Sequence, residues 1–337
     1  MPSTMVPIKK NTQLIPFSDA IKIAQLDSHT YAANLYDTFC IGTVPNGGYV
    51  ASCLLSAASI HLSSRGQVDV LTSHFEFISR TEVGPAVIVI EDIKLGRQLS
   101  TLHLTLYQDA LLPHAPFFTP ASSRKELLAY FTMTNLSREK GVSLPTNFSL
   151  HPPSPSDPDF ALLKDGKDKI WQPLVFAADD AFGYIRCLQN VIYYLPKHGQ
   201  PEKSIIDLWV RLANPGEKFT AASLAFVADC WPYVVEAYRP KTKEQEKDAA
   251  FKKDAVFWYP TVVLNLETKK NMGPGGNEWL RLRVQAKEIK NGRLDIEVLI
   301  FDIRGDLVAL SQHVNLVLGS ERNTAGRSGK KVEASKI

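Results

Sequence analysis

The most constraining feature of this sequence is that it carries the same order of predicted elements twice. The first copy is one long apolar helix followed by three strands, at residues 46–62, 71–77, 86–93 and 98–108. The second copy has the same order and similar lengths, at residues 221–238, 261–268, 279–289 and 293–302. A Gly-Pro turn follows the first strand of each copy, at Gly84-Pro85 and Gly273-Pro274. Because an internal repeat of this size indicates a duplicated structural unit, we predict two similar domains with a site at their seam.

Local signals support the elements of the first copy. Asn46 can cap the helix that follows it, since its side chain can accept a hydrogen bond from a free N–H group of the first turn. Gly66 follows the predicted end of that helix, where a left-handed backbone is common. In the third strand, Leu102, Leu104 and Leu106 alternate with polar residues, which predicts a sheet with one buried face.

A long apolar helix beside antiparallel strands is typical of the hot-dog fold, in which a sheet wraps around one central helix. We therefore predict the α+β class and a double hot-dog, with two antiparallel sheets each wrapped around a long central helix. A segment rich in Pro and Ser separates the two copies and predicts a linker. The predicted parts are an N-terminal domain, a linker, a C-terminal domain and a disordered tail, at residues 1–140, 141–160, 161–319 and 320–337.

The composition argues against several classes of protein. The chain is 45% hydrophobic and 22% charged, which is typical of a soluble globular protein. A formal net charge of +3, with basic residues scattered among acidic ones, argues against nucleic-acid binding. No apolar run approaches the roughly 18 residues that a membrane span needs. Four widely separated cysteines predict buried free thiols and a reducing compartment: Cys40, Cys53, Cys187 and Cys230.

The last three residues resemble a targeting signal. The chain ends in Ser335-Lys336-Ile337 after a polar stretch, and this tripeptide resembles the peroxisomal Ser-Lys-Leu signal with Ile in place of Leu. A receptor can read such a signal only where it is exposed, as we expect of a polar tail. We predict a peroxisomal protein, and the alternative is a cytoplasmic protein whose tail ends this way by chance.

Several segments, in their order along the chain, resemble thioesterase-like double hot-dog proteins. In the first copy they are Pro45-Asn-Gly-Gly-Tyr-Val-Ala51, Ser73-His-Phe-Glu-Phe77 and Gly96-Arg-Gln-Leu-Ser-Thr-Leu102. In the second copy they are Phe226-Val-Ala-Asp229, Glu278-Trp-Leu280, Asp302-Ile-Arg-Gly-Asp-Leu-Val308 and Ser311-Gln312. This order, over about residues 30–318, is similar to that of the type II acyl-CoA thioesterases.

The resemblance implies a hydrolytic site at three positions. In that family a water is activated by an Asp on the second helix, a Gln on the last strand and a Ser or Thr on the strand after the helix. Asp229 matches the Asp and Gln312 matches the Gln. The third position is occupied by Val263, which departs from the family pattern. Because Thr261, Val263 and Asn265 alternate onto one face of the predicted strand, we expect Thr261 or Asn265 to supply the polar group.

Hydrolysis of a thioester explains why such residues would be needed. Water is a poor nucleophile, and a carboxylate within hydrogen-bond reach can take its proton as the acyl carbon is attacked. Asp229 lies in an apolar stretch, where loss of solvent makes a carboxylate a better base. An amide such as Gln312 can hold the water. The tetrahedral oxyanion needs N–H donors, which Asn46, Gly47 and Gly48 would expose at the N-terminus of the first helix.

Each of these residues also has an ordinary structural interpretation. Asp229 could simply end the helix before Pro232, Gln312 could face solvent, and the two glycines could serve close packing alone. His74 and His313 flank apolar strands and are candidates for contact with substrate, although most such histidines are core or surface residues.

The sequence therefore favours an acyl-CoA thioesterase-like hydrolase, with acyl-CoA or another acyl thioester as its substrate. We expect no metal and no cofactor, since the chain has neither HExxH nor closely spaced His and Cys residues. A homodimer is a further prediction. Two alternatives stay open because a fold does not set a function. One is a hot-dog enzyme of a natural-product pathway that catalyses dehydration or cyclisation, and the other is a protein that binds acyl or lipophilic molecules without turnover.

Overall fold

The computed structural model describes residues 14–175 and 185–324. Within these residues, the α-helices of the first copy are α1 Phe17–Ala20 and α2 Gly47–His61. Its strands are β1 Ala24–Gln25, β2 Thr30–Leu35, β3 Cys40–Ile41, β4 Val44–Pro45, β5 Asp69–Phe77, β6 Gly84–Leu95, β7 Ser100–Gln108 and β8 Arg124–Thr134. Short 3-10 helices lie at Asp37–Phe39, Ser63–Arg65 and Leu136–Arg138.

The second copy has more short elements. Its α-helices are α3 Phe160–Lys164, α4 Leu224–Asp229, α5 Lys243–Glu246 and α6 Glu321–Thr324. Its strands are β9 Trp171–Pro173, β10 Val191–Pro196, β11 Ile205–Leu212, β12 Phe257–Trp258, β13 Thr261–Thr268, β14 Leu280–Gln285, β15 Ile289–Lys290, β16 Arg293–Phe301, β17 Leu307–Leu316 and β18 Leu318–Gly319. Short 3-10 helices lie at Arg186–Asn190, Ala221–Ser223 and Val234–Tyr238.

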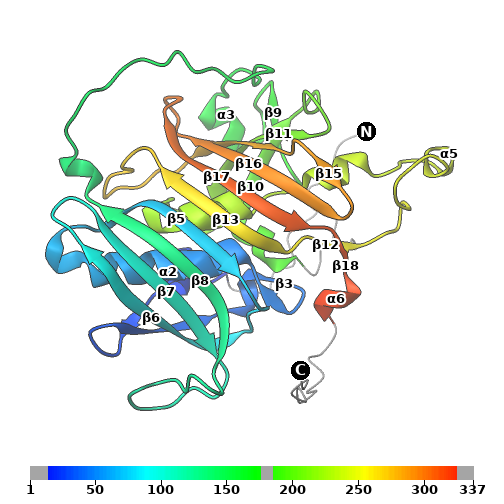
Figure 1. Ribbon diagram of the computed structural model, residues 1–337. Helices are drawn as coiled ribbons and strands as arrows, with labels where there is room; N and C mark the ends of the chain where they lie inside the picture. The colour runs from blue at the N-terminus through cyan, green and yellow to red at the C-terminus, as the bar shows by residue number, and fades with distance from the viewer. Residues whose placement is uncertain (1–13, 176–184, 325–337) are drawn as a thin grey trace.

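The main strands of the two copies join edge to edge into one antiparallel sheet (Figure 1). Among the described residues this sheet has 14 strands, and β5 pairs with β13 at the junction, where His74 lies opposite Asn265. Outward from the junction, the first copy places β8, β7, β6 and β2 in order, and the second copy places β17, β16, β14 and β11. The strand order of one copy therefore mirrors that of the other, so the sequence repeat is also a structural repeat.

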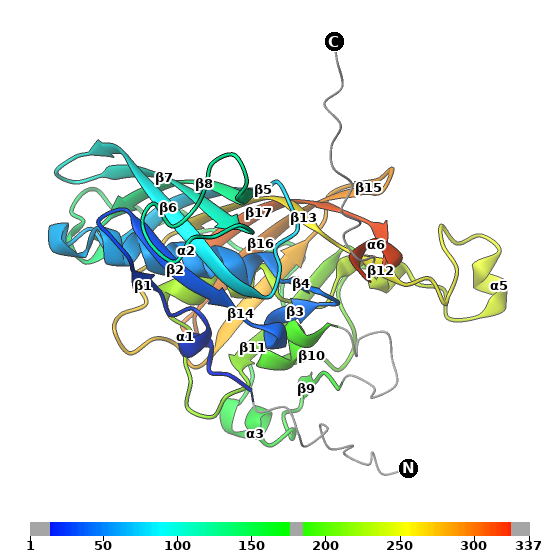
Figure 2. The same cartoon turned by 90° about the horizontal axis from the view of Figure 1, so that it is seen from below.

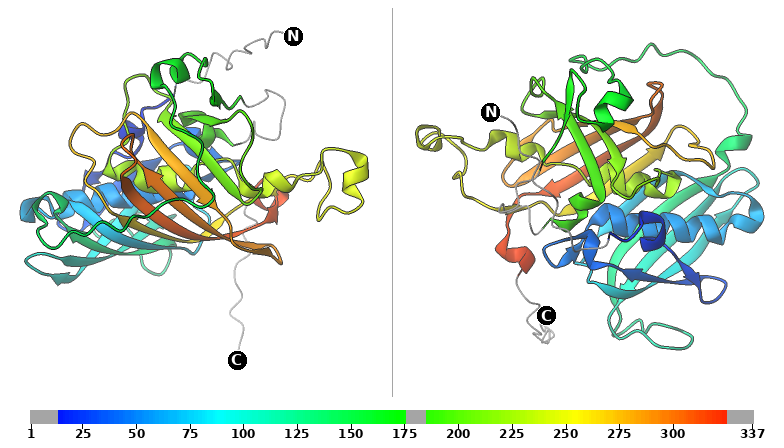
Figure 3. Two further views of the ribbon diagram at one scale, coloured as in Figure 1. Left: turned by 90° about the horizontal axis from the view of Figure 1, so that it is seen from above. Right: turned by 180° about the vertical axis from the view of Figure 1, so that it is seen from behind.

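Helix α2 lies against one face of this sheet, beneath the strands of the first copy in Figure 2 and in front of them in the rear view of Figure 3. Its residues from Gly48 to Leu55 are all buried, as expected of a helix that is apolar on every side. Asn46 caps the helix by accepting a hydrogen bond from the Tyr49 N–H, and Gly66 has the left-handed backbone that the sequence predicts. The fold is the predicted α+β double hot-dog, but the two predicted sheets are joined into one through the pairing of β5 with β13.

The helix of the second copy is shorter than the prediction over residues 221–238. Helix α4 has six residues and ends at Asp229, and the chain resumes helical geometry only in the 3-10 helix Val234–Tyr238. Pro232 accounts for the break, because proline lacks an N–H donor and disfavours a helical backbone at the residue before it. Asp229 is therefore the last residue of α4, and α4 packs against α2.

Three strands at the outer edge of the second copy, β9, β10 and β11, were not predicted from the sequence. Strand β11 pairs with β14 and holds the position that β2 holds in the first copy. Residues 139–159 connect the copies without helix or strand and run over the surface to α3 (Figure 1). None of the helices in the described residues is both long and apolar enough to cross a membrane.

Candidate active site

Asp229 lies at the seam between the two copies, where its carboxylate is buried and surrounded by donors. Its Oδ2 atom accepts hydrogen bonds from the backbone N–H of Gly48 at 2.8 Å and from the side-chain amide of Asn46 at 3.1 Å. Its Oδ1 atom accepts a hydrogen bond from the Thr261 hydroxyl at 2.8 Å and lies 3.5 Å from Nδ1 of His313. Two of these partners come from the first copy and two from the second, so the site requires both.

Asn46 has two roles at this seam. Its side-chain oxygen caps α2 by accepting from the Tyr49 N–H at 3.0 Å, while its amide nitrogen donates to Asp229. The first turn of a helix carries N–H groups with no partner in the helix, and they favour a negative charge nearby. The N-terminus of α2 is thereby fixed against the carboxylate of Asp229.

Gly48 allows the two helices to approach closely. A Cβ atom at Gly48 would lie 2.3 Å from the carbonyl oxygen of Ala225 and 2.7 Å from Cβ of Asp229. No side chain fits at such distances, so glycine here serves both close packing and the hydrogen bond to Asp229. At Gly47 a Cβ atom would lie 3.1 Å from Phe77 and 3.2 Å from Oδ2 of Asp229, which places Gly47 beside the same carboxylate.

Thr261 reaches Asp229 because of an irregularity in β13. The register of β13 against β17 shifts between Thr261 and Val263, which marks a β-bulge. The sequence prediction that Thr261 and Asn265 share one face is therefore wrong, since strict alternation is broken at the bulge. Thr261 faces Asp229, whereas Asn265 is exposed on the opposite face of the sheet.

Three residues of β17 face the same side as Asp229, and the sequence prediction gave them no catalytic role. Ser311, His313 and Asn315 are buried and alternate with exposed residues. Nε2 of His313 lies 2.8 Å from the hydroxyl of Ser311, and the Asn315 amide donates to the Thr261 hydroxyl at 2.8 Å. The alternation of this strand could have identified His313, had the inward face been known.

Gln312, Asn265 and His74 are not brought to Asp229. All three lie on the outer face of the sheet, where Nδ1 of His74 lies 2.7 Å from the side-chain oxygen of Asn265. They line a groove of about 410 Å³ that spans the junction of β5 and β13. The reason is the period of two along a strand, because Gln312 is adjacent to the inward His313 and so points outward.

Hydrogen bonds from two side chains hold the backbone on either side of Asp229. The Tyr193 hydroxyl donates to the carbonyl oxygen of Cys230 at 2.9 Å, and the Trp231 indole donates to that of Ala228 at 2.7 Å. Burial raises the pKa of the Tyr193 hydroxyl well above its usual value, so this group stays protonated and remains a donor. The end of α4 is therefore fixed from both sides.

The four cysteines are buried and free, which confirms the prediction of buried thiols. Burial raises the pKa of Cys40 and that of Cys53 to about 12. These thiols therefore stay protonated at neutral pH and are poor nucleophiles.

The sequence has relatives that carry the same two domains. Residues 35–130 match the acyl-CoA thioesterase N-terminal domain, and residues 158–317 match the acyl-CoA thioesterase C-terminal domain. The thioesterase-like protein TwmA of Talaromyces wortmannii is 45% identical over 336 residues, which cover 93% of this chain and 95% of that protein.

Solved structures share the fold at lower identity. A putative thioesterase II from Thermobifida fusca YX has a TM-score of 0.63 and 21% identity, over 89% of this chain and 97% of its own. A hot-dog protein of unknown function from Alicyclobacillus acidocaldarius has a TM-score of 0.67 and 18% identity, over the same shares. At these identities the structures show the fold alone, while the two domain matches and TwmA carry the assignment. The chain belongs to the acyl-CoA thioesterase family.

Proposed function

We propose that this protein hydrolyses acyl-CoA thioesters with the carboxylate of Asp229 as the general base. The observation that carries the proposal is the position of this buried carboxylate, which is held at the seam by donors from both copies. Membership of the acyl-CoA thioesterase family supports acyl-CoA as the class of substrate.

In the proposed reaction, a water beside Asp229 attacks the carbonyl carbon of the thioester while the carboxylate takes its proton. The resulting tetrahedral intermediate then loses its C–S bond. Asp229 returns the proton to the departing sulfur, so that the products are the free acid and the CoA thiol. Asn46 and Thr261 keep the carboxylate oriented through both steps, because each donates to one of its oxygen atoms.

The oxyanion of the intermediate needs a donor that Asp229 does not already occupy. The N–H of Gly48 donates to Asp229, whereas the N–H of half-buried Gly47 has no acceptor within the described part of the chain. Gly47 lies in the first turn of α2, where the helix dipole favours negative charge. We therefore assign the N–H of Gly47 to the oxyanion.

His313 takes the place that the sequence resemblance gave to Gln312. Its Nδ1 atom lies 3.5 Å from Oδ1 of Asp229 and has no hydrogen-bond partner among the described residues. A water that contacts both groups would be oriented by the imidazole and deprotonated by the carboxylate. Gln312, on the outer face, has no part in this proposal.

The test is the release of free CoA thiol from short-, medium- and long-chain acyl-CoAs. We expect Asp229→Asn to lower kcat/KM by about 100-fold or more, since a general base contributes at least that much. Gln312→Ala is the matched control and should keep the wild-type rate, because its side chain lies on the opposite face of β17. A folded Asp229→Asn protein with the wild-type rate would sink the proposal.

A second candidate function is favoured by the pairing of His313 with Asp229. Dehydration of a hydroxyacyl group needs a base for the α-proton and an acid for the departing hydroxyl, and an imidazole beside a carboxylate can supply both. If folded protein releases no thiol from any acyl-CoA, 3-hydroxyacyl thioesters should be tried next, with the appearance of the conjugated alkene as the signal. Binding of these thioesters without any turnover would favour a binding protein.

Two other predictions remain to be tested. Ser335-Lys336-Ile337 lies outside the described residues, and we propose that it directs the protein to the peroxisome. A reporter that carries this tripeptide and stays in the cytoplasm would contradict that proposal. The proposed homodimer can be tested by sedimentation equilibrium of the full chain.

A further inference from the structure

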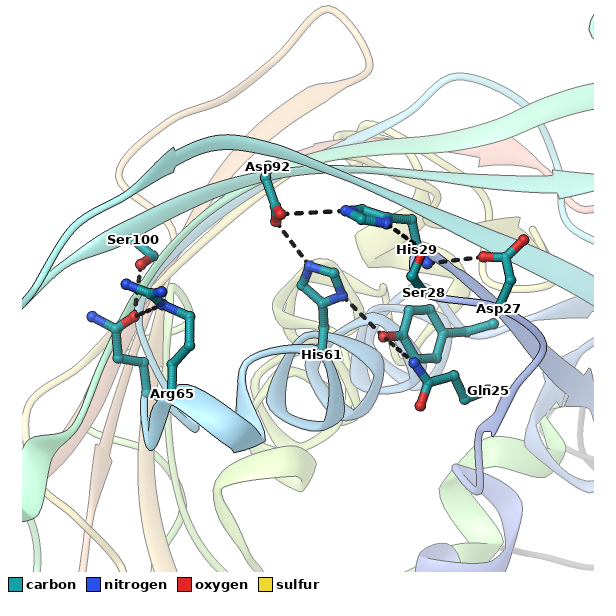
Figure 4. Close-up of polar contacts among 10 residues, drawn as sticks. Gln25, Asp27, Ser28, His29, His61, Arg65, Asp92 and Ser100 are labelled. Atoms are coloured by element: carbon teal, nitrogen blue, oxygen red, sulfur yellow. Dashed lines mark hydrogen bonds and ion pairs between the residues drawn. The ribbon is translucent and has the colours of Figure 1, made fainter.

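A second cluster of chemically active side chains lies at the other end of α2 (Figure 4). His61, the last residue of α2, points its Nε2 atom at Oδ1 of Asp92 in β6 at 2.8 Å. His29, in the turn before β2, points its Nε2 atom at Oδ2 of the same carboxylate at 3.3 Å. The two imidazoles and the carboxylate converge from three separate elements, and their nearest ligand atoms all lie within 4.8 Å of one another.

The other nitrogen of each imidazole has an oxygen partner. Nδ1 of His61 lies 2.9 Å from the Tyr31 hydroxyl, and Nδ1 of His29 lies 2.9 Å from the Ser28 hydroxyl. A hydroxyl oxygen can accept a proton from Nδ1, which leaves a lone pair on Nε2 facing the carboxylate. In that tautomer both lone pairs face the carboxylate, an arrangement that a cation bound among the three groups would stabilise. Histidines that bind metals regularly donate their second ring nitrogen to an oxygen acceptor, a role that these hydroxyl oxygens can fill.

We propose that His29, His61 and Asp92 bind a divalent first-row transition-metal ion, with Zn²⁺ as the best fit. Two imidazoles and one carboxylate form a three-ligand set that such ions favour, whereas Mg²⁺ and Ca²⁺ prefer oxygen ligands alone. Metal–ligand bonds of ~2.0–2.1 Å at a tetrahedral angle place two ligand atoms ~3.3 Å apart. The 3.3 Å between Nε2 of His29 and Oδ2 of Asp92 matches this separation. The 2.8 Å between Nε2 of His61 and Oδ1 of Asp92 must open by ~0.5 Å.

The three side chains differ in exposure, so an ion could reach the cluster from solvent through the most exposed of them. The His61 side chain is 7% exposed, that of Asp92 is 26% exposed and that of His29 is 47% exposed. Two ligands are thus held by the fold, while the third lies at the surface. A β-bulge follows Asp92, since the register of β6 against β7 shifts between Asp92 and Lys94, and such irregularities re-aim side chains.

This site lies far from Asp229. His61 ends the 15-residue helix whose first turn contacts Asp229, and a rise of ~1.5 Å per residue puts the two ends ~20 Å apart. The ion would therefore not act on the thioester. It would fasten the end of α2 to β6 and to the turn before β2. Arg65 and Gln67, just beyond α2, already bond to the carbonyl oxygen of Gly96 in the same part of the first copy.

The test is titration of chelator-treated full-length protein without a histidine tag. Calorimetry with Zn²⁺ should give one site per chain, and Co²⁺ should give visible absorption bands typical of nitrogen and oxygen ligands. An anaerobic titration with Fe²⁺ and an aerobic titration with Zn²⁺ compare the affinities of the site for the two ions. Mg²⁺ should not displace Zn²⁺ from the site. An ion that binds only the folded state stabilises that state, so the unfolding temperature should rise with the free Zn²⁺ concentration.

Variants can distinguish a metal site from a cluster that is held together by hydrogen bonds alone. His61→Gln and Asp92→Asn should each weaken Zn²⁺ binding by roughly 100-fold or more, and Tyr31→Phe by roughly tenfold, as loss of an orienting partner does elsewhere. His103→Gln is the matched control, because His103 also faces a carboxylate, Glu91 at 3.6 Å, but without a second imidazole. It should bind Zn²⁺ like the wild type.

Two results would overturn the proposal. One is folded wild-type protein that binds no Zn²⁺, which would show that protons alone bridge the three side chains. The other is binding that is equal in wild type, His61→Gln and Asp92→Asn. Since the measurements are of binding and unfolding, either result leaves the proposed thioesterase activity untouched.

Discussion

The carboxylate of Asp229 accepts a hydrogen bond of 2.8 Å from the backbone N–H of Gly48. This contact joins the end of α4 in the second copy to the first turn of α2 in the first copy. From the sequence we expected Asp229 to be the base and Gly48 to be a donor to the oxyanion, whereas in the structure these two residues are hydrogen-bonded to each other. The N–H of Gly48 holds the base in place, and the neighbouring Gly47 is left to meet the intermediate.

Substitution of Gly48 should damage both stability and activity. The Cβ atom of Gly48→Ala would lie 2.3 Å from the carbonyl oxygen of Ala225, so the helices must separate. We expect a loss of about 1–3 kcal/mol in the free energy of unfolding, together with a lower rate of thiol release. Urea unfolding measures the first effect. Gly275→Ala, where the added atom meets nothing within 4 Å, is the control and should be close to neutral.

The hydroxyl of Thr261 should matter more than its methyl group. Thr261→Val removes the donor to Oδ1 of Asp229 while keeping the shape of the side chain. A lost hydrogen bond to a charged group costs about 1.5–3 kcal/mol, so kcat/KM should fall by about tenfold or more. Thr261→Ser keeps the hydroxyl and should retain most of the activity. Equal rates in the two variants would show that the contact has no role in catalysis.

Removing one partner of a buried ion pair in the second copy should be strongly destabilising. Arg283 donates through Nε and Nη2 to the two carboxylate oxygens of Asp207 at 2.8 and 2.7 Å, and through Nη1 to the carbonyl oxygen of Pro152 at 2.5 Å. Asp207→Asn leaves the buried guanidinium without its counter-charge, which should cost about 3–5 kcal/mol in urea unfolding. Glu288→Gln disrupts the solvent-exposed pair with Lys290 and should change stability by less than about 0.5 kcal/mol.

Glu126 should make stability depend on pH near neutrality. Burial raises the pKa of this carboxyl group from 4.5 to about 7, and Arg124 offsets part of the shift. Between these two values the folded protein keeps a proton that the unfolded chain releases, so this contribution is full below pH 4.5 and is lost as the pH rises through about 7.

Glu126→Gln removes this titration. The stability of the variant relative to wild type should therefore increase as the pH is raised from about 5 to about 8. Chemical unfolding at several pH values measures the difference. Glu91→Gln, at a side chain that is 70% exposed, is the control and should not reproduce the trend. A difference between Glu126→Gln and wild type that does not vary with pH would contradict the assignment.

The parts of the fold that depend on local signals could be predicted from the sequence. Helix α2 begins at Gly47, directly after the Asn46 cap, because a side chain that accepts from the first turn acts within a few residues. The second helix was predicted too long, because its apolar pattern continues through residues that Pro232 prevents from being helical. The repeat itself was visible because both copies keep the same order of elements.

The site was harder to predict, because a shift of one residue along a strand decides which face of the sheet a side chain points to. Along β17, Gln312 and His313 differ by one position and therefore lie on opposite faces of the sheet. Along β13, a bulge turns Thr261 inward although strict alternation places it with the exposed Asn265. A resemblance in sequence can identify the strand, but it does not tell which side of the strand meets Asp229.

The cluster of His29, His61 and Asp92 could not be predicted at all. Its members lie in a turn, at the end of a helix and in a strand, and no short motif links them. Only the wrapping of β6 over the end of α2 brings them together. Searches for metal sites that rely on close spacing in the sequence miss sites of this kind.

The linker at residues 139–159 affects how the sequences of the two copies can diverge in evolution. Because one chain carries both copies, the second copy meets the first at a high effective concentration, and the seam stays assembled even when the protein is dilute. A dimer of identical chains would have to place the same residue on both sides of its seam. Here the first copy keeps Asn46 and Gly48 while the second keeps Asp229 and Thr261, so each copy can specialise without its partner having to follow.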